Sequence, residues 1–144
     1  MKNIGKIDVT RISKPPEKRE FETAKFLSQL GKDIEFIEPS RCKGARTPDI
    51  IMDGLKWEIK CPTGKSSRTI ENNFRAGLRQ SENIILDIRR CKLYENKSIG
   101  EIGRQFKLAK KAKRVIIITK RVKFLTMLSS LDIINDVGGV ATAG

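Results

Sequence analysis

One dipeptide, Asp53-Gly54, constrains the fold of this chain more than any other feature. Asp and Gly tolerate the positive φ angles of a tight turn, and this pair between two alternating apolar stretches is a strong hairpin signal. The turn also sets the register of the strands, because it places Ile50 opposite Trp57. We therefore predict an antiparallel hairpin on either side of this turn.

The two faces of the predicted hairpin differ in chemistry. Strand side chains alternate, so Ile50 and Trp57 lie on one face, whereas Asp49, Glu58 and Lys60 lie on the other. The register places Asp49 opposite Glu58, with β-carbons about 4.5–5.5 Å apart. Two carboxylates at this distance can bind one cation or raise each other's pKa. The alternative is an edge hairpin whose exposed charges form ordinary surface ion pairs.

Charge and composition reduce the number of possible functions. The chain has 144 residues, enough for one domain with its own core, and it carries a formal net charge of +13. Such an excess predicts a polyanionic partner, with nucleic acid ahead of an acidic membrane surface or an acidic protein. Histidine is absent from the sequence, which excludes Ser-His-Asp, Cys-His and histidine-metal mechanisms. Acid–base chemistry must therefore use carboxylates and lysines.

The cysteines support neither a disulfide framework nor a zinc site. Cys42, Cys61 and Cys91 are odd in number and lack CxxC spacing, so we expect three reduced thiols, with Cys61 merely adjacent to the acidic face. No apolar run reaches membrane-spanning length, and the N-terminus lacks a continuous apolar signal region. We expect no contact with a membrane.

The remaining sequence alternates between helical and extended patterns. Ser98 and Glu101 form a possible capping box for the third of four expected helices. The pattern predicts one α/β domain with a mixed central β-sheet flanked by helices. The expected helices are 17–31, 68–81, 98–111 and 124–131, and the expected strands outside the hairpin are 34–37, 84–88 and 115–118. We expect residues 1–16 to be a loose leader or short edge strand and residues 132–144 to be a frayed tail.

Basic residues follow the hairpin in two groups. Those from Lys60 to Gln80 are accompanied by a single acid, Glu71, and those from Arg104 to Lys123 by none. Each group alone could be a solvated helix face, but together they predict phosphate contacts along one side of the domain. The residues that we expect to contact nucleic acid are Lys65, Arg68, Arg75, Arg79, Gln80, Lys110, Lys111 and Lys113.

Several of these segments resemble a known nuclease family. Pro48-Asp49 followed by Glu58-Ile59-Lys60 resembles the signature of the PD-(D/E)xK superfamily. Together with the segments 19–27 and 79–87, the pattern resembles the C-terminal nuclease toxin domains of contact-dependent growth inhibition and related polymorphic toxins. This resemblance covers about residues 17–120.

The resemblance implies a restriction-endonuclease-like core over residues 17–131 that acts as a metal-dependent endonuclease. Its implied catalytic residues are Glu20, Asp49, Glu58 and Lys60, and Asp49 and Glu58 would hold the metal. Glu22 is the alternative third acid, but Glu20 lies closer to the buried face of its helix. Ligands that are all carboxylates favour Mg²⁺ or Mn²⁺ over Zn²⁺.

The resemblance also implies a substrate and a biological setting. It implies cleavage of tRNA by a domain that is delivered as the end of a larger toxin, acts in the target-cell cytoplasm and is restrained by a cognate immunity protein. We expect a monomer. A DNase of the same fold and a non-catalytic nucleic-acid-binding domain remain the alternatives.

Overall fold

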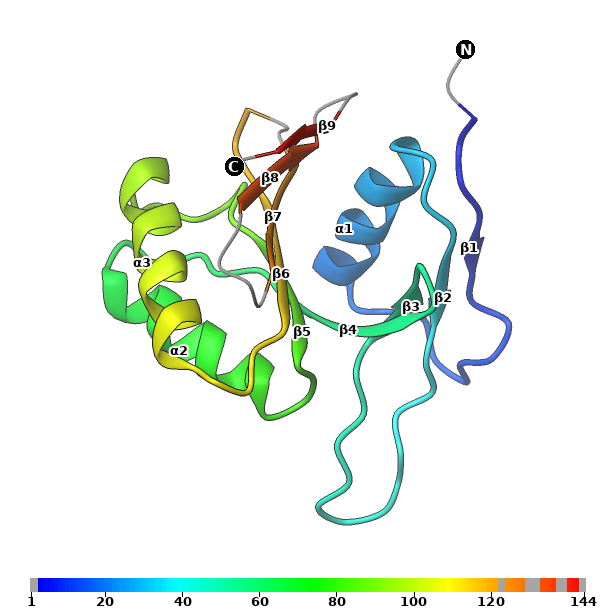
Figure 1. Cartoon of the computed structure of the whole chain (residues 1–144). Coiled ribbons are helices and arrows are strands. Elements are labelled where there is room, and N and C mark those ends of the chain that lie inside the picture. Colours follow the sequence, from blue (N-terminus) through cyan, green and yellow to red (C-terminus); the bar gives the residue numbers. More distant parts are fainter. Residues whose placement is uncertain (1–2, 122–123, 129–132, 137–139, 143–144) are drawn as a thin grey trace.

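The computed structural model describes residues 3–121, 124–128, 133–136 and 140–142. These residues form a single mixed α/β domain with one sheet, in which the strands follow one another in chain order (Figure 1). The helices are α1 (Lys18–Gln29), α2 (Ser67–Leu78) and α3 (Glu95–Leu108). The strands are β1 (Ile7–Asp8), β2 (Ile34–Phe36), β3 (Ile50–Met52), β4 (Leu55–Lys60), β5 (Asn83–Asp87), β6 (Arg114–Ile118), β7 (Phe124–Leu128), β8 (Ile133–Asp136) and β9 (Val140–Thr142).

The sheet is mixed, as the sequence predicts. Strands β4, β5 and β6 run parallel to one another, and α2 and α3 form the connections between them. Strand β1 is also parallel to β2, whereas the remaining neighbours are antiparallel. Figure 1 shows α2 and α3 on one face of the sheet and α1 on the other. The order of helices and strands therefore gives a three-layer arrangement.

Two apolar cores hold these layers together. Ile85 and Ile116 belong to the core beneath α1, whereas Ile84 and Val115 belong to the core beneath α2 and α3. Alternate residues of β5 and β6 thus face opposite cores, which explains why their sequences are almost continuously apolar. The two central strands supply a rigid platform on which β4 is aligned.

The fourth predicted helix is wrong. Residues 124–128 form strand β7, which pairs antiparallel with β6 from Phe124 opposite Ile118 to Leu128 opposite Arg114. A short apolar run fits either periodicity, and pairing with the exposed edge of β6 satisfies the backbone of both strands. The rest of that predicted helix, 129–131, lies outside the described residues.

Two further segments differ from the sequence prediction, and the leader agrees with it. Helix α3 begins at Glu95, so Ser98 is buried inside its first turn and does not cap it. Strands β8 and β9 extend the sheet within the segment expected to be a frayed tail. The leader contains β1, which agrees with the short edge strand that the sequence analysis gave as one of two expectations. Among the described residues, no helix is long and apolar enough to cross a membrane.

Candidate active site

The predicted hairpin forms β3 and β4 with the predicted register. Asp53 and Gly54 adopt φ angles of 54° and 76°, and Ile50 pairs with Trp57. Trp57 is 3% exposed, and its indole Nε1 donates to the Met52 carbonyl oxygen at 3.1 Å. The apolar face is therefore anchored in the core beneath α1, which fixes the direction of the opposite face.

Asp49 lies at the entrance to β3, where the regular ladder ends. Its backbone N donates to the Trp57 carbonyl oxygen at 2.9 Å, and its Oδ2 accepts a hydrogen bond from the Ile59 backbone N at 2.8 Å. The carboxylate thus accepts a hydrogen bond from β4 that the backbone of a neighbouring strand would otherwise accept, and this bond holds it beside Glu58. Burial raises the pKa of Asp49, although the bond from Ile59 and the positive charge of Lys60 oppose that rise.

Glu58 is the most buried acid of the site, with 6% of its surface exposed. Its Oε2 lies 3.4 Å from Lys60 Nζ, whereas its Oε1 is buried and finds no hydrogen-bond partner among the described residues. Burial first, and then the negative charge of Asp49, raise the pKa of Glu58 to about 8. A buried carboxylate with an unsatisfied oxygen is costly unless a proton or a cation compensates it.

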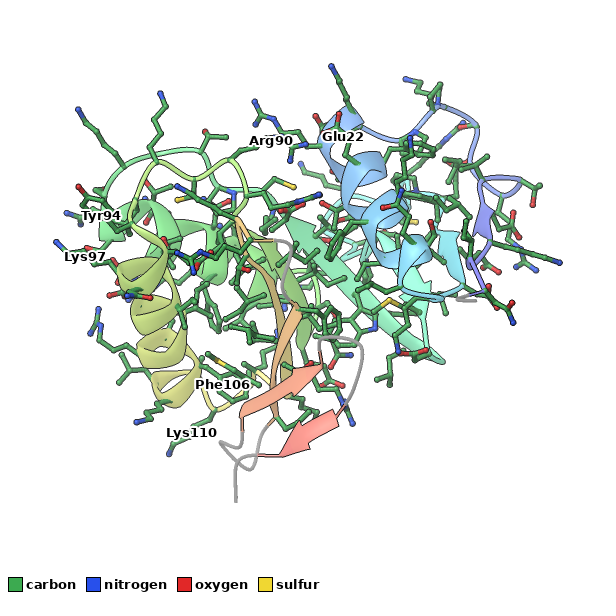
Figure 2. All side chains as sticks on the ribbon, turned by 90° about the horizontal axis from the view of Figure 1, so that it is seen from above. Glu22, Arg90, Tyr94, Lys97, Phe106 and Lys110 are labelled. Carbon is green, nitrogen blue, oxygen red and sulfur yellow. The ribbon has the colours of Figure 1, made fainter. Side chains whose placement is uncertain are left out.

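The first helix contributes Glu20 to the site and directs Glu22 elsewhere. Glu17 caps α1 by accepting from the backbone N of Glu20 at 3.2 Å, which places Glu20 in the first turn. Burial and then the charge of Asp49 raise the pKa of Glu20 to about 7. Glu22 instead forms an ion pair with Arg90, and Figure 2 shows the two side chains side by side. The geometry therefore favours Glu20 as the third acid.

A hydrogen-bond network after α2 attaches the hairpin to the rest of the sheet. Gln80 Oε1 accepts from the Thr47 backbone N at 3.2 Å, and Ser81 Oγ donates to the Lys56 carbonyl oxygen at 2.9 Å. The Asn83 side chain donates to the same carbonyl at 3.1 Å. Gln80, expected to contact nucleic acid, thus holds the segment that leads into Asp49.

A second buried network was missed by the sequence analysis. Asp87 is fully buried and accepts hydrogen bonds from Thr23 Oγ1 at 2.6 Å and from Arg89 Nε at 2.9 Å. These bonds join α1 to the end of β5, one helical turn after Glu20. Asp87 ends β5 directly after the apolar run Ile84-Ile85-Leu86. That isolated charge in a buried pattern is the sequence signal that could have revealed it.

Cys61 adjoins this network and is half-buried. Its Sγ lies 3.6 Å from Thr23 Oγ1, and burial raises the pKa of the thiol to about 11. Cys61 therefore remains a neutral thiol at neutral pH. Cys42 and Cys91 are free as well, which confirms the prediction of three reduced cysteines.

The basic residues named from the sequence are exposed, and two of them line a cleft beside the hairpin. Lys65, Arg68, Arg75, Arg79, Lys110, Lys111 and Lys113 all reach solvent. A cleft of about 460 Å³ contains Arg79 and Lys111, together with Arg46 and Lys56, which the sequence analysis did not select. Arg75 pairs with Glu71 at 2.9 Å. The cleft thus gathers positive charge from four separate segments.

The acids can accommodate a divalent cation through a pair of ligands. Asp49 and Glu58 provide carboxylate oxygens, and the unpartnered Oε1 of Glu58 is an available donor atom. Across the described ranges, no group of three or more His, Cys, Asp or Glu side chains is arranged to hold a metal. The residues present therefore fit an ion held by two carboxylates with its other positions left for water or substrate.

Comparisons with known proteins show the family and the fold of this chain. The family model described as the contact-dependent growth inhibition CdiA C-terminal domain matches residues 46–124, more than half of the chain. The chain is also similar to a solved CdiA-CT/CdiI toxin and immunity complex from Burkholderia pseudomallei. That match has a TM-score of 0.63 and 18% identity and covers 86% of this chain and 99% of that chain, which shows a shared fold. No curated protein matches the chain.

Proposed function

Because this chain belongs to the family of CdiA C-terminal toxin domains, we propose that it is a metal-dependent endonuclease that cleaves tRNA. The observation that carries this proposal is the convergence of Asp49, Glu58 and Lys60 on one face of a rigid hairpin, with Glu20 beside them. All three hairpin residues lie inside the segment that matches the family. Their order along the chain fits the PD-(D/E)xK pattern.

Asp49 and Glu58 would hold the cation. The raised pKa of Glu58, about 8, indicates that this acid carries a proton at neutral pH when no cation is present. Loss of that proton would create the second negative charge that a divalent ion requires. A bound divalent cation supplies an acidified water and a counter-charge for the phosphate. Mg²⁺ or Mn²⁺ suits this site better than Zn²⁺, because both protein ligands are carboxylates.

Lys60 and Glu20 would assist the reaction from two sides. Lys60 Nζ lies beside Glu58 on a rigid strand, where its positive charge can offset the charge that grows on the phosphate. Glu20 has a pKa of about 7, which suits a group that accepts or donates a proton near neutral pH. The two neighbouring acids have other roles, because Glu17 caps α1 and Glu22 forms an ion pair with Arg90.

The substrate assignment draws on the basic surface and on the family. The cleft lined by Arg46, Lys56, Arg79 and Lys111 reaches Pro48, the residue before Asp49. Phosphate contacts from such residues bind a backbone without reading its sequence. A folded tRNA offers a compact shape that a straight duplex lacks. Membership of a toxin family further supports delivery as part of a larger protein into a target cell and restraint by an immunity protein.

A cleavage assay tests the proposed activity directly. The purified chain is incubated with total tRNA and with plasmid DNA, each with Mg²⁺ or with a chelator. We expect cleavage of tRNA at one or a few positions with Mg²⁺ and none with the chelator. Lys60→Ala should remove this activity, whereas Lys32→Ala should not, because Lys32 pairs with Asp53 at 2.9 Å, away from the acids.

The other outcomes identify the competing functions. Degraded plasmid beside intact tRNA would replace the tRNA proposal with a DNase of the same fold. Binding of nucleic acid without cleavage under any of these conditions would support a non-catalytic binding domain. Equal cleavage with and without the chelator would contradict the role proposed for the metal.

A further inference from the structure

A small cavity opens beside the acids of the candidate active site, and we propose that it receives one unpaired nucleobase next to the cleaved phosphate. The inference rests on the proposed nuclease function and adds how the substrate would be held. Glu20 and Asp49 form one side of this cavity, and Ile12, Phe36 and Ile37 provide apolar walls. A group that occupies it would therefore lie next to the reacting acids.

The dimensions of the cavity suit a single ring system. Its volume is about 180 Å³, whereas pockets for drug-sized ligands have volumes of about 300–1,000 Å³. Six of its eleven lining residues are aliphatic, proline or aromatic, and these favour a flat apolar group over a phosphate or a sugar. A nucleobase meets this description, because both of its faces are apolar and its polar groups lie at its edge.

The walls of the cavity are fixed in place. Ser13 joins the segment before α1 to the segment after β2, since its backbone N and Oγ donate to Glu38 at 2.9 and 3.2 Å. Prolines 15, 16 and 39 line the same cavity and restrict its backbone. Phe36 stacks on Phe21 with ring centroids 6.4 Å apart. A preorganised pocket loses little entropy when a ligand enters.

The cavity and the basic cleft differ in the sign of their charge. The charged residues that line the cavity are Lys14, Glu17, Glu20, Glu38 and Asp49, so acids predominate and a phosphate would be repelled. The basic cleft reaches Pro48, whereas the cavity reaches Asp49, the next residue. A nucleic-acid strand could therefore keep its phosphates in the cleft and turn a neutral base into the cavity at the cleavage point. This division of charge identifies the occupant as a base.

Removal of single bases from the substrate tests this inference. The nucleic acid that the chain cleaves is prepared in versions that each lack one base near the cut, and kcat/KM is measured for each version. We expect one position to be sensitive, with a loss of about tenfold or more, as is typical when a base loses its binding surface. Ile12→Trp should fill the cavity and should remove the difference between the intact and the sensitive substrate.

A matched variant separates a filled cavity from general damage. Val9→Trp adds the same ring to the same N-terminal segment at a half-exposed position outside the cavity. In this variant, loss of the sensitive base from the substrate should still lower kcat/KM. Thermal melts of both tryptophan variants show whether they fold. If Ile12→Trp does not fold, Ile12→Ala is used in its place, and this variant leaves the cavity open. Base sensitivity should persist in Ile12→Ala. The base pocket would be overturned if no single missing base affected cleavage, or if Ile12→Trp remained fully sensitive to the missing base; the nuclease proposal would stand in both cases. Absence of all cleavage would instead overturn the proposed function itself.

Discussion

Glu58 Oε2 lies 3.4 Å from Lys60 Nζ, yet Glu58 Oε1 on the same carboxyl group is buried and has no partner among the described residues. The lysine compensates only part of the cost of burial, because the pKa of Glu58 still rises to about 8. Burial of the Glu58 carboxylate therefore destabilises the folded chain, and packing of the hairpin does not require an acid at this position. Such a cost is typical of a functional site.

The pH dependence of stability should reveal this buried acid. The pKa of Glu58 rises from 4.5 to about 8 on folding, so the folded chain holds a proton that the unfolded chain releases. The free energy of unfolding should fall as the pH rises between these two values in the presence of a chelator. Glu58→Gln should reduce that fall, and Glu82→Gln, at a surface ion pair with Lys113, should not. Identical pH profiles for the native chain and Glu58→Gln would contradict the proposed burial cost.

The two glutamates of α1 should differ in their effect on activity. Glu20→Gln removes the acid beside Asp49, so cleavage should fall by about 10²–10⁴-fold, as is typical when a group that accepts or donates a proton in the reaction is lost. Glu22→Gln removes an ion pair with Arg90 and should leave the rate near that of the native chain. Single-turnover cleavage rates provide the measurement. A larger loss in Glu22→Gln would mean that the third acid is wrongly assigned.

Trp57 should affect stability through packing. Its side chain is almost completely buried and donates a hydrogen bond to Met52, so Trp57→Ala should lower the free energy of unfolding by about 3–5 kcal/mol. Lys56→Ala, at the exposed neighbouring position, should change it by less than about 0.5 kcal/mol. Denaturant titration of both variants checks this expectation. A fully stable Trp57→Ala variant would show that the faces of the hairpin are assigned wrongly.

Charge reversal on α2 should weaken binding of nucleic acid. Arg75 and Arg79 are exposed and one helical turn apart, so Arg75→Glu combined with Arg79→Glu should lower affinity and reduce its salt dependence. Lys25→Glu combined with Lys97→Glu makes the same change in net charge on α1 and α3 and should have less effect. Binding is measured over a series of salt concentrations with a chelator present. Equal losses in both double variants would indicate attraction by net charge alone.

The sequence predicted the hairpin, its register and the two central strands because each has a strong local signal. Asp53-Gly54 specifies its turn directly, and the apolar runs of β5 and β6 have the composition of strands covered on both faces. Strand β7 could not be predicted in this way, because its pairing with β6 depends on a neighbour and not on its own periodicity.

The candidate site was predictable only where its residues lie on one hairpin. Asp49, Glu58 and Lys60 follow from the turn and from strand alternation, whereas the choice between Glu20 and Glu22 depends on how α1 packs against the sheet. Arg46, in the loop before β3, and Lys56, on β4, form the basic cleft together with Arg79 and Lys111, which come from distant segments of the chain. Contacts between distant segments are therefore the part of the site that the sequence did not reveal.

Binding of Mn²⁺ tests the central claim most directly, because it requires neither a substrate nor a choice between RNA and DNA. Calorimetric titration of the purified chain is carried out at neutral pH in two buffers that differ in ionisation enthalpy. We predict that an ion binds and releases about one proton, mainly from Glu58, since ligands must be deprotonated to bind a metal. Asp49→Asn and Glu58→Gln should each abolish binding, whereas Glu22→Gln should retain it. Absence of binding to the native chain, or equal binding by Glu58→Gln, would contradict the account.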